Sequence, residues 1–179
     1  MAPDWRTDLR EQRTAKDDYF GSNPHSPIPE AERDEFDGLS YYPIDEAYRY
    51  ELEIHEHDDP DEVVVGTSTG GEQTYLEWGE FRFTVDGEHA TLQAYKGESD
   101  QERLWVPFRD ATSGEETYGA GRYLDLEPDD HLLDDGRWLL DFNQAYNPTC
   151  AYSDHYECPL PPTENWLEVP IEAGEQSFH

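Results

Sequence analysis

The sequence predicts a mainly β protein, an antiparallel sandwich or partly open barrel that carries an amphipathic helix at its N-terminus. From residue 48 onward, apolar and polar residues alternate in short runs, which is the two-residue period of half-buried strands. Glycine-containing turns such as Asp86-Gly87 separate these runs, and Asp-Gly is a strong hairpin signal. No regular alternation of strands and helices is visible, so a parallel sheet is not expected.

The first predicted element is a helix over residues 5–20 (WRTDLREQRTAKDDYF). Trp5, Leu9 and Phe20 are spaced among charged residues there, and residues 5–20 contain neither Gly nor Pro. We expect this helix to act as a lid or brace. Residues 21–29 hold three prolines and are expected to be irregular, before a short helix over residues 30–36.

The predicted strands follow the alternating pattern, which begins with apolar side chains at every second position of residues 48–54. Further strands are predicted over residues 63–66, 74–78, 80–85, 89–95, 103–108, 122–126, 137–142 and 166–171. A chain of 179 residues is long enough for one domain with a real core. We therefore predict a single domain, in which residues 1–47 form a helical and irregular brace and residues 48–179 form the β-rich body.

The chain is strongly acidic: 43 Asp and Glu stand against 12 Lys and Arg, and the formal net charge is −31. The carboxylates are spread over almost every segment instead of being gathered in a tail. Such a surface repels itself at low salt, whereas at about 1 M salt a Debye length of about 3 Å screens the repulsion. We therefore predict a halophilic protein of a salt-rich cytoplasm. The alternative is an acidic protein that awaits a basic partner.

The same composition excludes other classes of protein. A nucleic-acid partner and an anionic membrane both require a basic surface, which this chain lacks. Residues 1–10 (MAPDWRTDLR) contain no apolar stretch that would form the core of a signal peptide, and we predict a soluble cytoplasmic protein. Five Trp, twelve Tyr and seven Phe distinguish the chain from a disordered one.

Residues 107–127 (PFRDATSGEETYGAGRYLDLE) are the first candidate for a functional segment. Two of the few cations, Arg109 and Arg122, bracket a loop rich in Gly, Ser and Thr. Strand alternation directs the guanidinium of Arg122 toward the core, where a charge needs a partner. Arg binds a carboxylate or phosphate through two hydrogen bonds, and glycine backbone N–H groups approach anions closely. A ligand is one candidate partner, and a carboxylate of the chain, Asp110, Asp125 or Asp141, is the other.

Residues 139–152 (LLDFNQAYNPTCAY) are the second candidate. Asp141 follows an apolar run and precedes a mixture of donors, acceptors and aromatic rings that is typical of pocket walls. The same residues also suit an ordered loop that closes the end of a barrel. For an enzyme, Asp141 is the candidate general base and Cys150 the candidate nucleophile.

Cys150, His155 and Cys158 lie within nine residues (CAYSDHYEC) and are the candidate metal ligands. Their spacing differs from the paired Cys-x-x-Cys of structural zinc sites, so neither a metal nor another cofactor is predicted. Two cysteines do not make a disulfide framework, and a reducing cytoplasm favours free thiols. The motifs Gly-x-Ser-x-Gly, His-Glu-x-x-His and Gly-x-x-x-x-Gly-Lys-[Ser/Thr] do not occur, so the serine hydrolase, zinc peptidase and P-loop classes lose their usual support.

Three blocks carry a family resemblance: PFRDATSGEETYGAGRYLDLE, LDFNQAYNPTCAY and CPLPPTENWLEVPIEAGE. With them, the chain resembles a bacterial and archaeal family of uncharacterised proteins, domain-of-unknown-function family 1684, over most of its length. The resemblance implies one full-length domain and no particular activity. It directs attention to members of the blocks with polar or aromatic side chains: Arg109, Asp110, Tyr118, Arg122, Asp141, Asn143, Tyr146, Asn147, Cys150 and Cys158.

These observations predict a small polar or anionic ligand bound between the loops of residues 109–122 and 141–150. The predicted ligand-binding residues are Arg109, Asp110, Thr112, Ser113, Tyr118, Arg122, Asn143, Tyr146 and Asn147. Two alternatives stay open. One is an enzyme of hydrolase-like reaction that uses the same pocket through Asp141 or Cys150, and the other is a structural or interaction module without a ligand. A protein partner is left undetermined.

Overall fold

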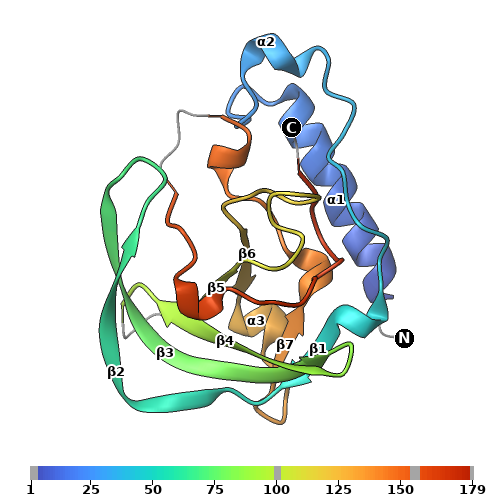
Figure 1. Cartoon of the computed structure of the whole chain (residues 1–179). Coiled ribbons are helices and arrows are strands. Elements are labelled where there is room, and N and C mark those ends of the chain that lie inside the picture. The colour runs from blue at the N-terminus through green and yellow to red at the C-terminus, as the bar shows by residue number, and fades with distance from the viewer. Residues whose placement is uncertain (1–3, 99–101, 154–157, 178–179) are drawn as a thin grey trace.

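The computed structural model describes residues 4–98, 102–153 and 158–177 (Figure 1). In chain order, the helices and strands are α1 (Trp5–Ser22), α2 (Glu30–Arg33), β1 (Arg49–Leu52), β2 (His55–Gly66), β3 (Glu72–Val85), β4 (Glu88–Lys96), β5 (Leu104–Phe108), β6 (Arg122–Leu126), α3 (Pro128–His131) and β7 (Trp138–Asp141). Single 3₁₀ turns are η1 (Glu46–Tyr48), η2 (Phe142–Gln144), η3 (Thr149–Ala151) and η4 (Thr163–Asn165).

The strands form two antiparallel sheets. Five of them pair in the order β2-β3-β4-β5-β6, and β1 pairs with β7 in a second, two-stranded sheet. The long β2–β3 hairpin curls around one side of the molecule, and α1 lies along the other side (Figure 1). The predicted mainly β, antiparallel fold with an N-terminal helix is confirmed, and its sheets stay open instead of closing into a barrel.

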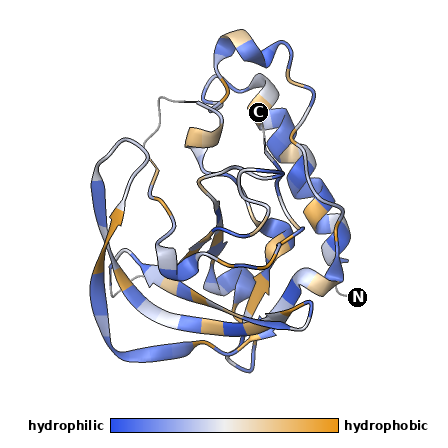
Figure 2. Cartoon of the chain, viewed as in Figure 1, coloured by the Kyte–Doolittle hydropathy of each residue, from blue (hydrophilic) through white to orange (hydrophobic). Residues whose placement is uncertain are grey.

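The main core lies on the face of the five-stranded sheet that β1 and β7 cover. Alternation along β5 directs Leu104, Val106 and Phe108 to this face. Phe142, which follows β7, packs its ring 5.4 Å from both Phe83 and Phe108, measured between centroids. Alternating hydropathy along β3 is visible in Figure 2, whereas most of β2 is hydrophilic. Burial of these rings and aliphatic side chains is the main stabilising contribution to the sheet.

The helix α1 begins at a side-chain cap, because the Asp4 carboxylate accepts a hydrogen bond from the backbone N–H of Arg6 at 3.1 Å. Leu9 and Phe20 are its buried apolar residues. Their spacing of 11 residues places them on one face with the cations Arg13 and Lys16, which also face the β body. The predicted helix is confirmed, and it lays two cations against the body.

Three local predictions are corrected. Residues 72–85 form one continuous strand in place of two, because Gly79 fits inside the sheet where a Cβ would lie 2.9 Å from Cγ1 of Ile54. Residues 166–171 form no strand: Trp166 makes a single parallel bridge to Arg109, and Pro170 has no N–H to donate. The second helix ends at Arg33.

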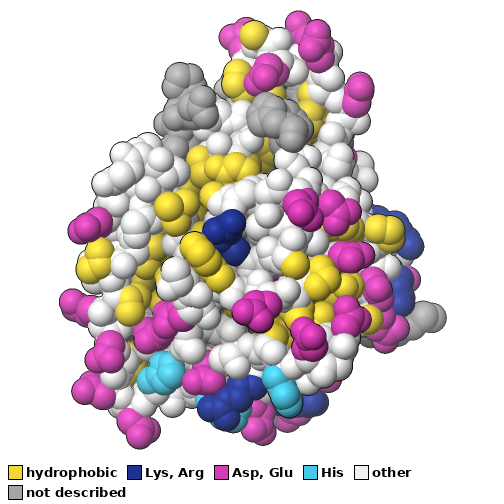
Figure 3. Space-filling view, viewed as in Figure 1, with side chains coloured by type: hydrophobic (Ala, Val, Ile, Leu, Met, Phe, Trp, Pro, Cys, Tyr) yellow, Lys and Arg dark blue, Asp and Glu magenta, His cyan; other side chains and the backbone are white. Residues whose placement is uncertain are grey.

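The acidic side chains are scattered over the face shown in Figure 3, with few Lys or Arg among them. This matches the dispersed distribution along the sequence. Within residues 4–98, 102–153 and 158–177, no helix is long and apolar enough to cross a membrane.

Candidate functional site

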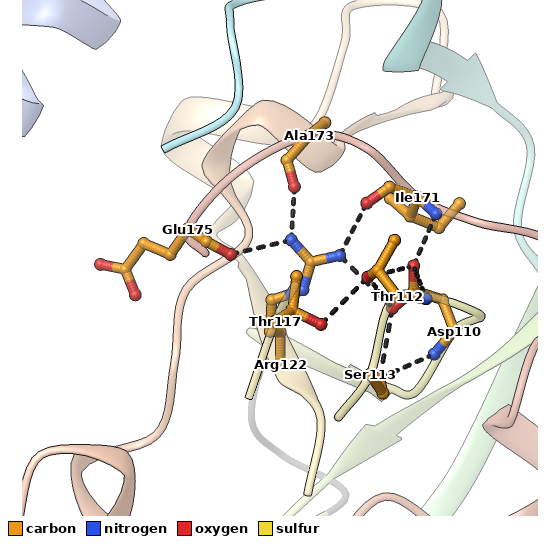
Figure 4. Close-up of polar contacts among 8 residues, drawn as sticks. All are labelled: Asp110, Thr112, Ser113, Thr117, Arg122, Ile171, Ala173 and Glu175. Atoms are coloured by element: carbon orange, nitrogen blue, oxygen red, sulfur yellow. Dashed lines mark hydrogen bonds and ion pairs between the residues drawn. The ribbon is translucent and has the colours of Figure 1, made fainter. Parts of the chain in front are cut away.

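Arg122 lies on β6 with its side chain fully buried, and it points inward as the sequence predicted. Its Nη2 donates to the carbonyl oxygen of Ile171 at 2.9 Å, and its Nη1 donates to the carbonyl oxygens of Ala173 and of Glu175 (Figure 4). Nη2 also lies 3.5 Å from Oδ1 of Asp110. Burial lowers the pKa of the Arg122 guanidinium, and the Asp110 carboxylate opposes that shift. This guanidinium therefore holds the C-terminal segment onto β6.

Asp110 is the centre of the loop that follows β5. Its carboxylate accepts hydrogen bonds from the hydroxyl of Thr112 at 2.8 Å and from the backbone N–H of Ile171 at 2.6 Å. The hydroxyl of Thr112 also lies 3.0 Å from that of Thr117, and the hydroxyl of Ser113 contacts Asp110 (Figure 4). The polar side chains predicted for a ligand here bond to one another.

Arg109 lies apart from Arg122. Its guanidinium carbon is 4.5 Å from the ring centroid of Trp166, a cation–π contact at the surface, where Trp166 is 49% exposed. The neighbouring backbone fixes this contact, because the N–H of Leu167 donates to the carbonyl oxygen of Arg109 at 2.7 Å. The structure thus directs the two arginines to different places.

The two predicted loops meet at Tyr118 and Cys150, where the tyrosine hydroxyl lies 3.4 Å from the sulfur. Burial raises the pKa of Cys150 to about 11, which disfavours the thiolate that a nucleophile requires. Asp141, the other candidate catalytic residue, is buried, accepts from the N–H of Asn143 and pairs with Arg49 at 3.0 Å. Both candidates are thus engaged with the chain itself.

Tyr146 lies where three hollows adjoin, and each hollow includes its ring. The first, the helix hollow, lies under α1, has a volume of about 210 Å³ and is lined by Leu9, Gln12, Arg13, Lys16, Tyr41, Asp125, Asn143, Gln144, Ala145, Tyr146 and Glu175. The second, the aromatic hollow, is lined by Tyr75, Tyr95, Gly97, Arg103, Trp105, Tyr123, Tyr146 and Pro159. The third, the thiol hollow, is lined by Lys16, Phe20, Tyr123, Tyr146, Asn147, Pro148, Thr149, Tyr152 and Cys158.

Of the nine predicted ligand-binding residues, Asn143, Tyr146 and Asn147 line these hollows, and the other six do not. Reading the sequence missed the contribution of α1. Arg13 and Lys16 share the helix face of Leu9 and Phe20, and charges on an apolar helical stripe were the signal that could have revealed it.

The helix hollow contains donors without an acceptor. The Nε of Arg13 and the hydroxyl of Tyr41 are buried and have no hydrogen-bond partner in the described chain. The two Nη atoms of Arg13 donate instead to the carbonyl oxygens of Tyr42 at 3.4 Å and Asn143 at 3.1 Å, and its guanidinium covers the Tyr41 ring at 4.2 Å. Burial lowers the pKa of Arg13 and raises the pKa of Tyr41. A buried donor that is left unpaired carries a desolvation cost of about 1–3 kcal/mol.

The nearby carboxylate of Glu175 is engaged by other donors. Its Oε1 pairs with the ammonium of Lys16, and its Oε2 accepts from the hydroxyl of Tyr152 at 2.8 Å and the backbone N–H of Asn147 at 2.5 Å. Glu175 makes no hydrogen bond to Nε of Arg13 or to the hydroxyl of Tyr41.

The aromatic hollow lies on the other face of the five-stranded sheet. The Trp105 ring lies 4.7 Å from that of Tyr75 and 5.1 Å from that of Tyr123, which in turn meets Tyr146 edge-on at 5.8 Å. At its rim, the hydroxyl of Tyr95 donates to Glu164. Because these rings pack against each other, they form one side of the hollow and are not arranged around a central space.

A carboxyl pair adjoins this wall, because Glu164 also shares a hydrogen bond with Glu77 of β3. Burial and this contact raise the pKa of Glu77 to about 7. In the folded protein the Glu77 carboxyl keeps its proton up to about pH 7, whereas in the unfolded chain it loses that proton near its ordinary pKa of 4.5. The stability that this group contributes is full below about pH 4.5 and is lost as the pH rises through 7.

We therefore expect Glu77→Gln to have a melting temperature that falls less between pH 5 and pH 8 than that of the wild type. The exposed Glu62→Gln on β2 is the matched control and keeps the wild-type profile. Thermal unfolding in 2 M KCl, which suppresses long-range repulsion, measures the difference. Identical slopes for all three proteins would contradict the shared proton.

Within the described residues, no group of three His, Cys, Asp or Glu side chains is arranged to hold a metal ion. Of the candidate ligands, Cys150 and Cys158 lie close together, and the N–H of Cys150 donates to the sulfur of Cys158 at 3.3 Å. His155 lies outside the described residues.

The chain is thus an open antiparallel β protein whose helix α1 lines two of the three hollows that share Tyr146. The chain belongs to the family described as protein of unknown function DUF1684, which matches residues 34–176. The family predicted from the sequence blocks is confirmed. The helix α1 precedes the matched range, although it forms one wall of the helix hollow.

A solved relative extends the likeness to the helix. The chain is 46% identical to an uncharacterized protein of Haloarcula marismortui with a solution NMR structure, at a TM-score of 0.73. That match covers 96% of this chain and 94% of the other, which takes in most of α1. No curated protein matches the chain.

Proposed function

We propose that the protein binds a small polar or anionic ligand in the helix hollow. The observation that carries the proposal is the pair of buried donors, Arg13 Nε and the Tyr41 hydroxyl, which have no acceptor in the described chain. A ligand with acceptor oxygens, such as a carboxylate or phosphate, would satisfy both. This keeps the ligand class predicted from the sequence but moves its cation from Arg122 to Arg13.

Three further features support this place. The hollow has a volume of about 210 Å³, a size for a small molecule. Its walls combine apolar surface from Leu9 and Ala145 with a few converging polar groups, as binding sites do. Lys16 adds a second cation, although Glu175 balances its charge, so the ligand is held by directed hydrogen bonds more than by net charge.

We expect Tyr41→Phe to abolish binding while leaving the fold intact. The hydroxyl has no protein partner, so its removal relieves a desolvation cost and leaves the melting temperature of the free protein unchanged or slightly raised. The control is Tyr19→Phe, which changes an exposed tyrosine of α1.

Thermal unfolding with increasing inorganic phosphate, acetate or citrate at constant 2 M KCl measures the effect. A ligand at 100 times its Kd stabilises by about 2.7 kcal/mol. Stabilisation of the wild type and Tyr19→Phe, but not of Tyr41→Phe, is the expected result. Equal stabilisation of the wild type, Tyr19→Phe and Tyr41→Phe would contradict this site. Failure of every probe to stabilise any of the three proteins would contradict this ligand class.

The dispersed carboxylates support a second proposal, that the protein works in a salt-rich cytoplasm. Its negative charges are spread over strands, turns and the helix, and salt screens the repulsion among such exposed charges. The salt dependence of unfolding, described in the Discussion, is the corresponding test.

A further inference from the structure

Cys150 and Cys158 lie on two separately anchored segments that bring their sulfur atoms together. The thiols share a hydrogen bond, and the sulfur of Cys158 also accepts from the backbone N–H of Cys150 at 3.3 Å. The hydroxyl of Thr149 lies 3.5 Å from the same sulfur. Both cysteines are free thiols in the structure.

Cys158 is held by the β2–β3 turn. Its N–H donates to the hydroxyl of Ser68 at 3.1 Å, and its carbonyl oxygen accepts from the N–H of Ser68 at 3.0 Å. One residue further, Pro159 bridges Thr67, and the N–H of Leu160 donates to the carbonyl oxygen of Gly66 at 2.8 Å. This cysteine is therefore positioned by residues some 90 positions earlier in the chain.

Cys150 shares the hydroxyl of Ser68 with Cys158 and is also held by contacts of its own. It lies in the 3₁₀ turn η3, where the N–H of Ala151 donates to the carbonyl oxygen of Pro148 at 2.9 Å. The hydroxyl of Tyr118, from the other predicted loop, lies 3.4 Å from its sulfur. Because contacts with distant segments hold both thiols, with the hydroxyl of Ser68 contacting each of them, their proximity is a property of the tertiary structure.

We propose that Cys150 and Cys158 form a reversible intramolecular disulfide when the protein meets a low-molecular-weight disulfide. In the first step, the thiolate of the more exposed Cys150 attacks the reagent, such as glutathione disulfide, and expels one glutathione thiolate. In the second step, the thiolate of Cys158 attacks the Cys150 sulfur of this mixed disulfide and expels the second. Two protein S–H bonds are lost and one S–S bond forms, while two electrons and two protons pass to the two glutathione molecules.

The disulfide has two local consequences. It removes the S–H donor of Cys150 at its contact with Tyr118, where the two loops meet. It also alters the wall of the thiol hollow, because Cys158 lines that hollow beside Tyr146. Burial raises the pKa of Cys150 to about 11, so the exchange is slow near neutral pH and accelerates as the pH rises.

The test equilibrates the protein in glutathione redox buffers at pH 8.5, once in 2 M KCl and once unfolded in 6 M guanidinium chloride. Acid quenching and intact mass spectrometry then measure the fraction that has lost two hydrogen atoms. A preorganised pair gives an equilibrium constant for the disulfide at least about tenfold larger in the folded protein. Cys150→Ser and Cys158→Ser should form only the mixed disulfide with glutathione.

Ser68→Ala tests whether the anchoring of Cys158, and not only its short sequence separation from Cys150, favours the disulfide. Loss of this hydroxyl frees the N–H of Cys158, so the folded-state advantage should shrink toward the unfolded value. Thr69→Ala in the same turn should retain it. An equilibrium constant in the folded protein equal to or below the unfolded one, or formation of intermolecular dimers only, would overturn the proposal.

Discussion

Replacing Arg122 with methionine is expected to destabilise the protein by about 3–5 kcal/mol, the range found when one partner of a buried ion pair is removed. The change leaves the buried Asp110 carboxylate without its cation. It also leaves the carbonyl oxygens of Ile171, Ala173 and Glu175 without their donor. We expect a melting temperature lower by roughly 6–20 °C, since each kcal/mol shifts it by about 2–4 °C at this size.

A matched control and a second variant keep this prediction testable if Arg122→Met fails to fold. Arg109→Met removes the half-buried guanidinium over Trp166 and should cost only about 0.5–1 kcal/mol. Asp110→Asn keeps one of the two acceptor oxygens and removes the charge but leaves Arg122 bonded to its carbonyl oxygens, so it should destabilise less than Arg122→Met. Equal, small effects of Arg122→Met and Arg109→Met in urea unfolding would show that Arg122 does not hold the C-terminal segment.

Raising KCl from 0.1 M to 2 M is expected to stabilise the protein by several kcal/mol. Neighbouring exposed like charges repel by about 0.2–0.5 kcal/mol per pair, so about ten such pairs amount to roughly 2–5 kcal/mol. A Debye length that falls from about 10 Å to below about 3 Å removes most of that repulsion. Urea unfolding at each KCl concentration measures the gain, and constant or falling stability would contradict salt adaptation.

A charge-reduced variant distinguishes screening from a general effect of salt on hydrophobic burial. The strand β2 carries exposed carboxylates close together, and the variant replaces them with amides: Glu56, Asp58, Asp59, Asp61 and Glu62. It should be more stable than the wild type at 0.1 M KCl and gain less on going to 2 M. If both proteins gain equally, the salt effect does not arise from this repulsion.

Most of the fold could be predicted from the sequence, because local periodicity reports which side of an element is buried. The α1 helix and strands β4, β5 and β6 lie close to their predicted bounds. The errors occur where tertiary contacts override a local signal. Gly79 looks like a strand end, yet its missing Cβ is what lets Ile54 pack against the middle of β3.

The candidate site was less predictable, for a physical reason that Arg122 shows. Alternation along β6 directed its guanidinium inward, and the structure confirms that direction. Alternation says nothing about which segment meets the side chain. The partners are carbonyl oxygens at residues 171–175, about 50 positions later, and only the folded chain brings them there. The same holds for Arg13, whose hollow requires Tyr41 and Glu175 to meet α1.

The antiparallel β class, the N-terminal helix, the family and the dispersed negative charge follow from the sequence, because each is encoded in composition or in residues close together along the chain. The folded structure was needed to show which cation faces a hollow, which cation is buried in a network, and that the two cysteines touch. Those properties depend on contacts between distant segments, whose pairing no local pattern specifies.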